Sequence, residues 1–340
     1  MLGALMANNN FKAFAAAAGA NVMTQADYEA LAALLTGFQS GTAQSQQLNK
    51  VWRQSSIMAA VLAQFIVDLT GQDAIDDGTT ATLLANLKMA VQAQSVAVVG
   101  QARNVSMSVT AGSSTATLTA DEIVVGAALG GKKYVLGAFS KTINLAATGA
   151  GGMDTGSAPA SGFVALYAIY NPTTGTSALL ATNATSTVAP SVYGGANMPS
   201  GYTASALVSV WATTSGSLLA IGLQNDRAVS IFVQSALNSS TQQPTMTALN
   251  IAAIVPKNAR SISGVLHIGS TAASSGFINV ASSSNSVGQQ NLGTYVSQTT
   301  VPIESPFSNL QIITPQTMYY VATTASGTMS AVIYISGYSF

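Results

Sequence analysis

The spacing of apolar residues changes near residue 100, and this change limits the chain to one class of fold. Before that point the apolar residues recur at the three- and four-residue steps of a helix, whereas after it they alternate with polar residues as in strands. The sequence therefore predicts a mainly β protein with an N-terminal α-helical region, which would form a helical stalk.

Three helices are expected before residue 100. Thr24 is followed three residues later by an acidic residue, as in a capping box, so the first helix should begin there and end near Gly37. The second is expected over roughly residues 42–69. The third should follow a turn rich in aspartate, with Asp77 or Thr79 as its cap.

The second and third helices share a heptad pattern. Their apolar residues fall on alternate steps of three and four, with Ser55 and Gln94 at the polar positions. This pattern fits either an ordinary packed helical hairpin or helices that pack against copies of themselves around an axis. In the second alternative the chain is a homotrimer, and its seam consists of Leu48, Val51, Met58, Leu62, Phe65, Leu69, Leu84, Leu87 and Val91.

The region after residue 100 is expected to form two β-sandwich, jelly-roll-like domains, because it holds many short strands separated by turns. The predicted domain bounds are 1–100 for the helical region, 101–233 for the first β-sandwich and 234–340 for the C-terminal one. Strands are expected at 117–125, 133–139, 162–170, 204–211, 228–233, 262–268, 276–281, 309–313, 318–323 and 328–336.

The charge of the chain excludes several classes of function. Charged residues make up 6% of the sequence, and the eleven basic and eleven acidic residues cancel, so no field would attract nucleic acid. The longest apolar run, 57–69, is too short to cross a bilayer, and we expect no membrane insertion. Without cysteine, neither disulfides nor thiolate metal sites can form. Residues 1–10 lack the basic residues of a secretion signal.

Groups that could carry catalysis are few. The acidic residues after position 100 are Asp121, Glu122, Asp154, Asp226 and Glu304. Glycoside hydrolysis needs two carboxylates that face each other across a sugar, and the adjacent Asp121 and Glu122 should point to opposite faces of a strand. His267 should lie on the strand face opposite its apolar neighbours, although copies could meet at a trimer axis. We expect no enzyme, no cofactor and no metal.

Two sets of segments resemble known proteins. Gly19–Leu31 (GANVMTQADYEAL) and Leu48–Ser56 (LNKVWRQSS), continuing to residue 66, are similar to the N-terminal region of tail fibre proteins of tailed bacteriophages that infect Gram-negative bacteria. Gly149–Gly162 (GAGGMDTGSAPASG), Tyr167–Gly175 (YAIYNPTTG) and Tyr193–Pro199 (YGGANMP) are similar to a β-module of the same fibres. The region after residue 234 carries the least resemblance.

The resemblance implies a homotrimeric fibre of the virion that is assembled in the cytoplasm of the host bacterium. Residues 1–100 would attach to baseplate or tail proteins, and residues 234–340 would bind a bacterial surface glycan or pilus. Contacts that are weak individually would become tight through multivalency. The alternatives are a purely structural baseplate or tail component without receptor contact, and a polysaccharide depolymerase.

Receptor contacts of this kind combine aromatic faces with amide hydrogen bonds. Both are present near the C-terminus, although each aromatic residue could instead serve core or intersubunit packing. The candidate receptor-binding residues are Gln289, Gln290, Asn291, Tyr295, Phe307, Asn309, Tyr338 and Phe340.

Overall fold

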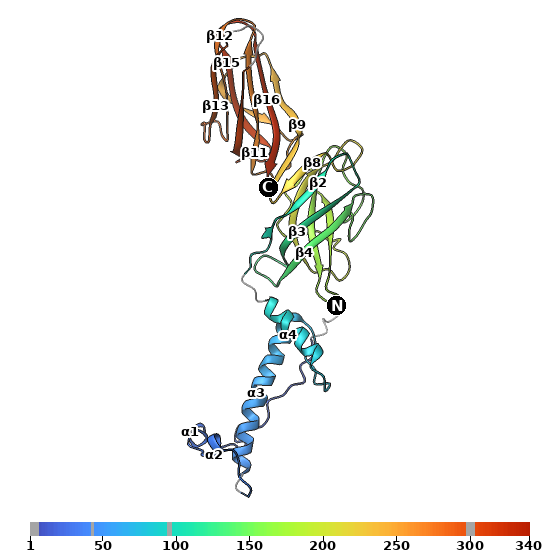
Figure 1. Cartoon of the computed structure of the whole chain (residues 1–340), viewed down its shortest axis with the longest axis vertical. Coiled ribbons are helices and arrows are strands. Elements are labelled where there is room, and N and C mark those ends of the chain that lie inside the picture. The colour runs from blue at the N-terminus through green and yellow to red at the C-terminus, as the bar shows by residue number, and fades with distance from the viewer. Residues whose placement is uncertain (1–6, 42–43, 94–96, 297–302) are drawn as a thin grey trace. The chain divides into compact units, whose positions relative to one another are not determined.

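The computed structural model describes residues 7–41, 44–93, 97–296 and 303–340, and the chain forms two compact units, 1–96 and 97–340. The first unit holds the helices and the second holds two antiparallel sheets (Figure 1). The predicted mainly β class with a helical N-terminal region is therefore confirmed. A domain boundary at residue 233 stays a prediction.

Four helices lie in the described part of the first unit. They are α1 (Gln25–Glu29), α2 (Ala33–Thr36), α3 (Ser45–Thr70) and α4 (Ala81–Ala93). The first expected helix is thus two short helices, while the second and third lie close to their expected positions.

Of the two helix caps predicted from the sequence, one is present in the structure. The Thr24 hydroxyl accepts the Asp27 N–H at 3.2 Å, as the capping box predicts. In contrast, α4 begins at Ala81, so neither Asp77 nor Thr79 precedes it directly. The Asp77 carboxylate instead accepts the N–H and the hydroxyl of Thr79, both at 2.8 Å. These bonds, the N–H first, lower the pKa of Asp77.

The core of the first unit lies between α3, α4 and the N-terminal segment. Ala63 and Ile66 of α3 are buried, and Phe11 and Leu87 pack against them. The N-terminal segment is fixed beside α3 by main-chain hydrogen bonds to Ala74, which is also buried. The predicted helical hairpin is therefore present within one chain.

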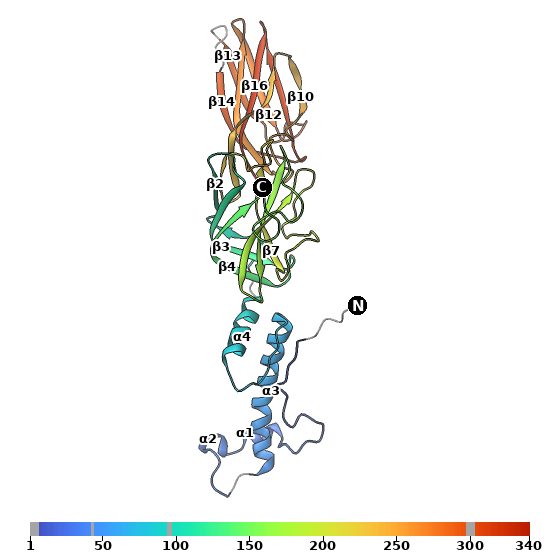
Figure 2. The same ribbon diagram turned by 90° about the vertical axis from the view of Figure 1, so that its right-hand side faces the viewer.

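The larger sheet has a continuous path of antiparallel strands among the described residues (Figure 2). In spatial order these are β14 (Ile303–Gln311), β11 (Ser261–Ser270), β16 (Met329–Ser339), β9 (Ala228–Ser239), β8 (Gly222–Asn225), β2 (Ser106–Val109), β3 (Thr115–Gly126), β7 (Ala204–Ala212), β5 (Phe163–Asn171) and β6 (Thr176–Asn183). Two further strands, β1 (Ala102–Arg103) and β4 (Lys133–Asn144), also pair with β3.

The smaller sheet has the order β10 (Gln243–Asn250), β15 (Thr317–Thr324), β12 (Ser274–Ala281) and β13 (Gln290–Val296). Each expected strand overlaps an observed one. The strand expected at 309–313 is displaced, because β14 ends at Gln311. The strands β1, β2, β6, β8, β10 and β13 were not expected, since they are short or rich in polar residues.

The core of the second unit is formed by strands in which apolar and polar side chains alternate. In β3, Ala116, Leu118 and Ala120 are buried, whereas Thr117 and Thr119 between them are exposed. The strands β5 and β7 are buried on both faces and accordingly are almost continuously apolar.

Strand β9 connects β14, β11 and β16 to the other strands of the larger sheet, because it pairs with β8 at its start and with β16 along its length. Side chains reinforce this connection. The Asn258 amide accepts the Ala189 N–H at 2.9 Å and donates to the Ala189 oxygen at 2.8 Å. The Tyr338 hydroxyl donates to the Val210 oxygen at 2.6 Å.

Candidate functional site

The predicted trimer seam lies on a face of α3 that the described residues leave partly open. The exposed fractions of Met58, Leu62 and Phe65 are 58%, 49% and 36%. Leu48, Val51, Leu69 and Leu87 are half-buried, whereas Leu84 and Val91 of α4 are exposed. Ile57 and Val61, also exposed, widen the apolar face of α3.

The contacts of the hairpin use a different part of α3. The buried residues Ala63 and Ile66 face the hairpin core, and they are one position beyond Leu62 and Phe65 in the sequence. One residue turns a helix by about 100°. Packing of α3 against α4 therefore covers part of the seam, with Leu87 in the hairpin core, and leaves Met58, Leu62 and Phe65 partly exposed. The trimer stays a prediction.

Two of the aromatic residues predicted to bind a receptor are part of the core. Phe307 and Tyr338 are 2% and 3% exposed, so in this structure neither ring offers an accessible binding surface. Phe307 is buried because it lies opposite Gly264, whose lack of a side chain leaves room for the ring. The ring of Tyr338 is buried with its hydroxyl bonded to Val210.

The other two predicted aromatic residues are Phe340 and Tyr295. Phe340 is half-buried, and the Arg227 guanidinium lies over its ring at 5.1 Å from the centroid. Burial lowers the pKa of Arg227, and the nearby charge of Arg260 adds to this effect. The side chain of Tyr295 lies outside the described part of the structure.

The polar residues of the predicted site come together where β13 meets β14. The Gln290 amide donates to the Ser308 oxygen at 2.8 Å and accepts the Ser308 N–H at 3.0 Å. Gln289 donates to Asn291 at 2.6 Å, and Asn309 follows Ser308 directly. Gln290 thus joins the smaller sheet to the larger one. Its hydrogen-bonding groups are engaged within the chain.

His267 has the strand position that the sequence predicts. It is partly exposed, whereas Ile262, Leu266 and Ile268 on the opposite face of β11 are buried. Its Nδ1 lies 3.2 Å from Oε1 of Glu304 on the paired strand β14. Contact between copies of His267 at a trimer axis stays a hypothesis.

The carboxylates of the second unit hold local structure together. Asp121 accepts from the Asn104 amide at 2.6 Å, and Asp226 accepts the Val105 N–H at 3.0 Å. Asp154 accepts from the Tyr193 hydroxyl at 3.0 Å. Burial and this hydrogen bond raise the pKa of Tyr193.

The described residues contain neither a cluster of metal-ligating side chains nor a membrane-spanning helix. No group of three or more histidine and carboxylate side chains is placed to hold a metal ion. No helix within the described ranges has the length and apolar character needed to cross a membrane.

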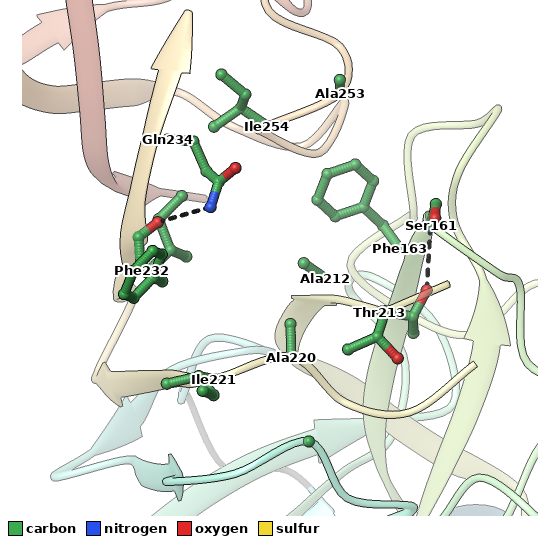
Figure 3. Close-up of a pocket in the computed structure, with 14 residues that line it drawn as sticks. Ser161, Phe163, Ala212, Thr213, Ala220, Ile221, Phe232, Gln234, Ala253 and Ile254 are labelled. Carbon is green, nitrogen blue, oxygen red and sulfur yellow. Dashed lines mark hydrogen bonds between the residues drawn. The ribbon is translucent and has the colours of Figure 1, made fainter. Parts of the chain in front are cut away.

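A hollow of about 450 Å³ lies in the second unit beside β8 and β9. Figure 3 shows Phe232 and Gln234 of β9 on one side and Ser161 and Phe163 on the other, with Ile254 above. Phe232 is 71% exposed, which makes it the most exposed aromatic ring among the large apolar residues described. None of the residues predicted to bind a receptor lines this hollow.

A signal for Phe232 was present in the sequence. It lies within a strand that was predicted, and its neighbours at i−2 and i+2 are Ser230 and Gln234. A phenylalanine that shares a strand face with polar residues is placed toward solvent by the period of two.

Comparisons with known proteins give little guidance. No protein family and no curated protein sequence matches the chain. A tryptic core variant of the Bacillus thuringiensis toxin Cry1Da is 9% identical, with a TM-score of 0.18 over 74% of this chain and 54% of the toxin. The mosquito-larvicidal toxin Cry4Aa of Bacillus thuringiensis is 8% identical, with a TM-score of 0.17 over 74% and 55%. The chain spans about half of each toxin, and likeness at this level carries no argument.

Proposed function

We propose that this protein is a homotrimeric tail fibre of a tailed bacteriophage and mediates adsorption to a Gram-negative host. The observation that carries the proposal is the part of the heptad face of α3 that stays exposed, at Met58, Leu62 and Phe65. The resemblance of the N-terminal and middle segments to phage fibres supports the same conclusion. In this proposal the β region forms two sandwich domains of the jelly-roll kind.

Self-association explains the apolar face of α3 in physical terms. Fully burying a large apolar side chain contributes about 1.5–3 kcal/mol, so each half-exposed residue on this face would add about 1 kcal/mol on assembly. In a coiled coil such residues insert between side chains of the neighbouring helix. The seam is uncharged, and like-charge repulsion would not oppose assembly of identical chains.

The proposed adhesion depends on many weak contacts. A neutral surface rich in hydroxyl and amide groups suits hydrogen bonding to a glycan or a pilus. Three copies in each fibre raise the effective affinity when several bind together. In this proposal residues 1–100 attach the fibre to the baseplate or tail.

The trimer is tested by light scattering of the purified full chain, which should give about three times the chain mass of 34.3 kDa. Leu62→Asp should shift the mass toward that of a monomer, because assembly would bury three unpaired carboxylates near one axis. The matched control is Leu35→Asp, since Leu35 is 94% exposed and lies outside the seam. A monomeric wild-type chain, or loss of assembly in both variants, contradicts the seam.

Adsorption is tested by incubating the fluorescently labelled full chain with host cells. A receptor-binding fibre labels the cells and slows phage adsorption by competition. A purely structural baseplate component does neither. Release of oligosaccharide from purified surface polymer would instead identify a depolymerase.

A further inference from the structure

The hollow beside β9 has walls that the fold holds in place. The Thr213 hydroxyl donates to the Pro159 oxygen at 2.6 Å and accepts the Gly162 N–H at 3.1 Å. The Ser161 N–H donates to the Thr214 oxygen at 2.9 Å. These bonds fix the side of the hollow that faces Phe232 and Gln234 (Figure 3). A preformed wall lowers the entropic cost of binding a ligand.

The opposite wall and the roof are fixed as well. Phe232 and Gln234 belong to β9, which is paired with β16 at Gln234 and with β8 at Ile231. The roof residue Ile254 lies in a turn closed by its own N–H, which donates to the Ile251 oxygen at 3.0 Å.

The chemistry of the lining selects a neutral ligand. None of the described residues that line the hollow is charged, so it offers no counter-charge to a phosphate, a carboxylate or an ammonium group. Phe163, Ile221 and Phe232 supply apolar surface, while Ser161 and Gln234 supply polar groups. A sugar ring matches this combination, because it has apolar C–H faces and a rim of hydroxyl groups.

Two polar side chains retain hydrogen-bonding capacity. Within the described residues the Ser161 hydroxyl has no hydrogen-bond partner, and the Gln234 amide makes one long bond of 3.4 Å to the Phe232 oxygen. A ligand hydroxyl could bond to either group. A volume of about 450 Å³ falls within the range typical of small-molecule sites.

We propose that this hollow binds a neutral sugar unit of a surface glycan, with the exposed face of Phe232 against the ring and Gln234 and Ser161 bonded to its hydroxyls. The inference rests on the proposed adhesive function and gives it a site and a ligand class. It places receptor contact beside β9, away from the residues around β13 and β14 that the sequence favoured.

The experiment is saturation-transfer NMR on the full chain with a panel of neutral sugars. The panel contains the methyl glycosides of glucose, galactose, mannose, N-acetylglucosamine and N-acetylgalactosamine, and glucuronic acid is the charged comparison. At least one neutral sugar should receive saturation at its ring C–H protons, and glucuronic acid should receive none.

Three variants test the assigned residues. Phe232→Ala should weaken binding of that sugar about tenfold, which corresponds to about 1.4 kcal/mol. Gln234→Ala should weaken it to a smaller extent. The control is Leu223→Ala, because Leu223 is also exposed on β8 but does not line the hollow. Phe232 is 71% exposed, so its truncation should leave the core intact.

Several outcomes would overturn the assignment. They are failure of every neutral sugar to bind the wild type, equal binding by Phe232→Ala, or preference for glucuronic acid. A lower mass of Phe232→Ala in light scattering would show that this face contacts a second copy of the chain instead. If the wild type still labels host cells in any of these cases, the adhesive function stands and the site lies elsewhere.

Discussion

Replacing Tyr338 by phenylalanine tests the side-chain contact between β16 and β7. The Tyr338 side chain is 3% exposed, and its hydroxyl donates a hydrogen bond of 2.6 Å to the Val210 oxygen. Tyr338 lies on β16 and Val210 on β7, which are far apart in the sequence and are not paired in the sheet. The substitution removes this bond and leaves the ring in place.

The expected loss follows from burial of both partners. Val210 is 0% exposed, so its oxygen would lose a partner that water cannot readily replace. Leaving a buried acceptor unsatisfied costs about 1–3 kcal/mol. We therefore expect Tyr338→Phe to lower the free energy of unfolding by about 1–3 kcal/mol at neutral pH.

The effect should depend on pH in a defined direction. Burial raises the pKa of Tyr338 above its ordinary value of about 10, so above that pH the unfolded chain loses a proton that the folded chain keeps. The contribution of Tyr338 to stability is complete below pH ~10 and falls as pH rises, by about 1.4 kcal/mol per unit. The Tyr338→Phe variant cannot ionise there, so its deficit should shrink.

The assay is urea unfolding followed by the fluorescence of Trp211, which is buried next to Val210. The chain has two tryptophans, and Trp52→Phe leaves Trp211 as the single reporter. The control is Tyr334→Phe on the same strand, since its hydroxyl has no hydrogen-bond partner among the described residues. A loss below about 0.5 kcal/mol, or the same deficit at neutral pH and at about pH 11, would refute the reasoning.

Two further substitutions test contacts of the second unit, each by its urea midpoint. Asn258→Ala should cost about 1–3 kcal/mol, because it removes both hydrogen bonds to Ala189, whereas Asn285→Ala on an exposed loop should be neutral. Gly264→Ala should cost about 2–3 kcal/mol, because its new methyl group would overlap main-chain atoms of the neighbouring strand. Gly293→Ala, with open space around it, is its control. Equal midpoints within either pair would contradict the corresponding argument.

The candidate site was predicted from sequence only in part. Asn291 and Asn309 are exposed, as their polar segments predict, and Gln290 of β13 is bonded to Ser308 of β14, next to Asn309. The burial of the aromatic rings could not be predicted, because the number of neighbours around a ring depends on strands from elsewhere in the chain. Phe307 is covered through its pairing opposite Gly264, a contact that the local sequence of β14 does not encode.

The sequence by itself determined part of the local structure of this protein. The capping residue Thr24, the heptad spacing of α3 and the alternation in β3 and β11 each depend on residues within a few positions of one another. Spacing of this kind fixes backbone periodicity and the face on which His267 lies, because helices and strands have fixed repeats.

Only the tertiary structure decided which apolar side chains are covered. Leu62 and Ile66 of α3 are both apolar, yet the hairpin buries Ile66 and leaves Leu62 half-exposed. The Tyr338 side chain is buried, and its hydroxyl is bonded to Val210 of β7. In contrast, Phe232 on the adjacent strand β9 faces solvent beside the hollow. Burial is a property of long-range packing between segments that are distant in sequence, and local periodicity gives a side chain's direction without specifying what lies there.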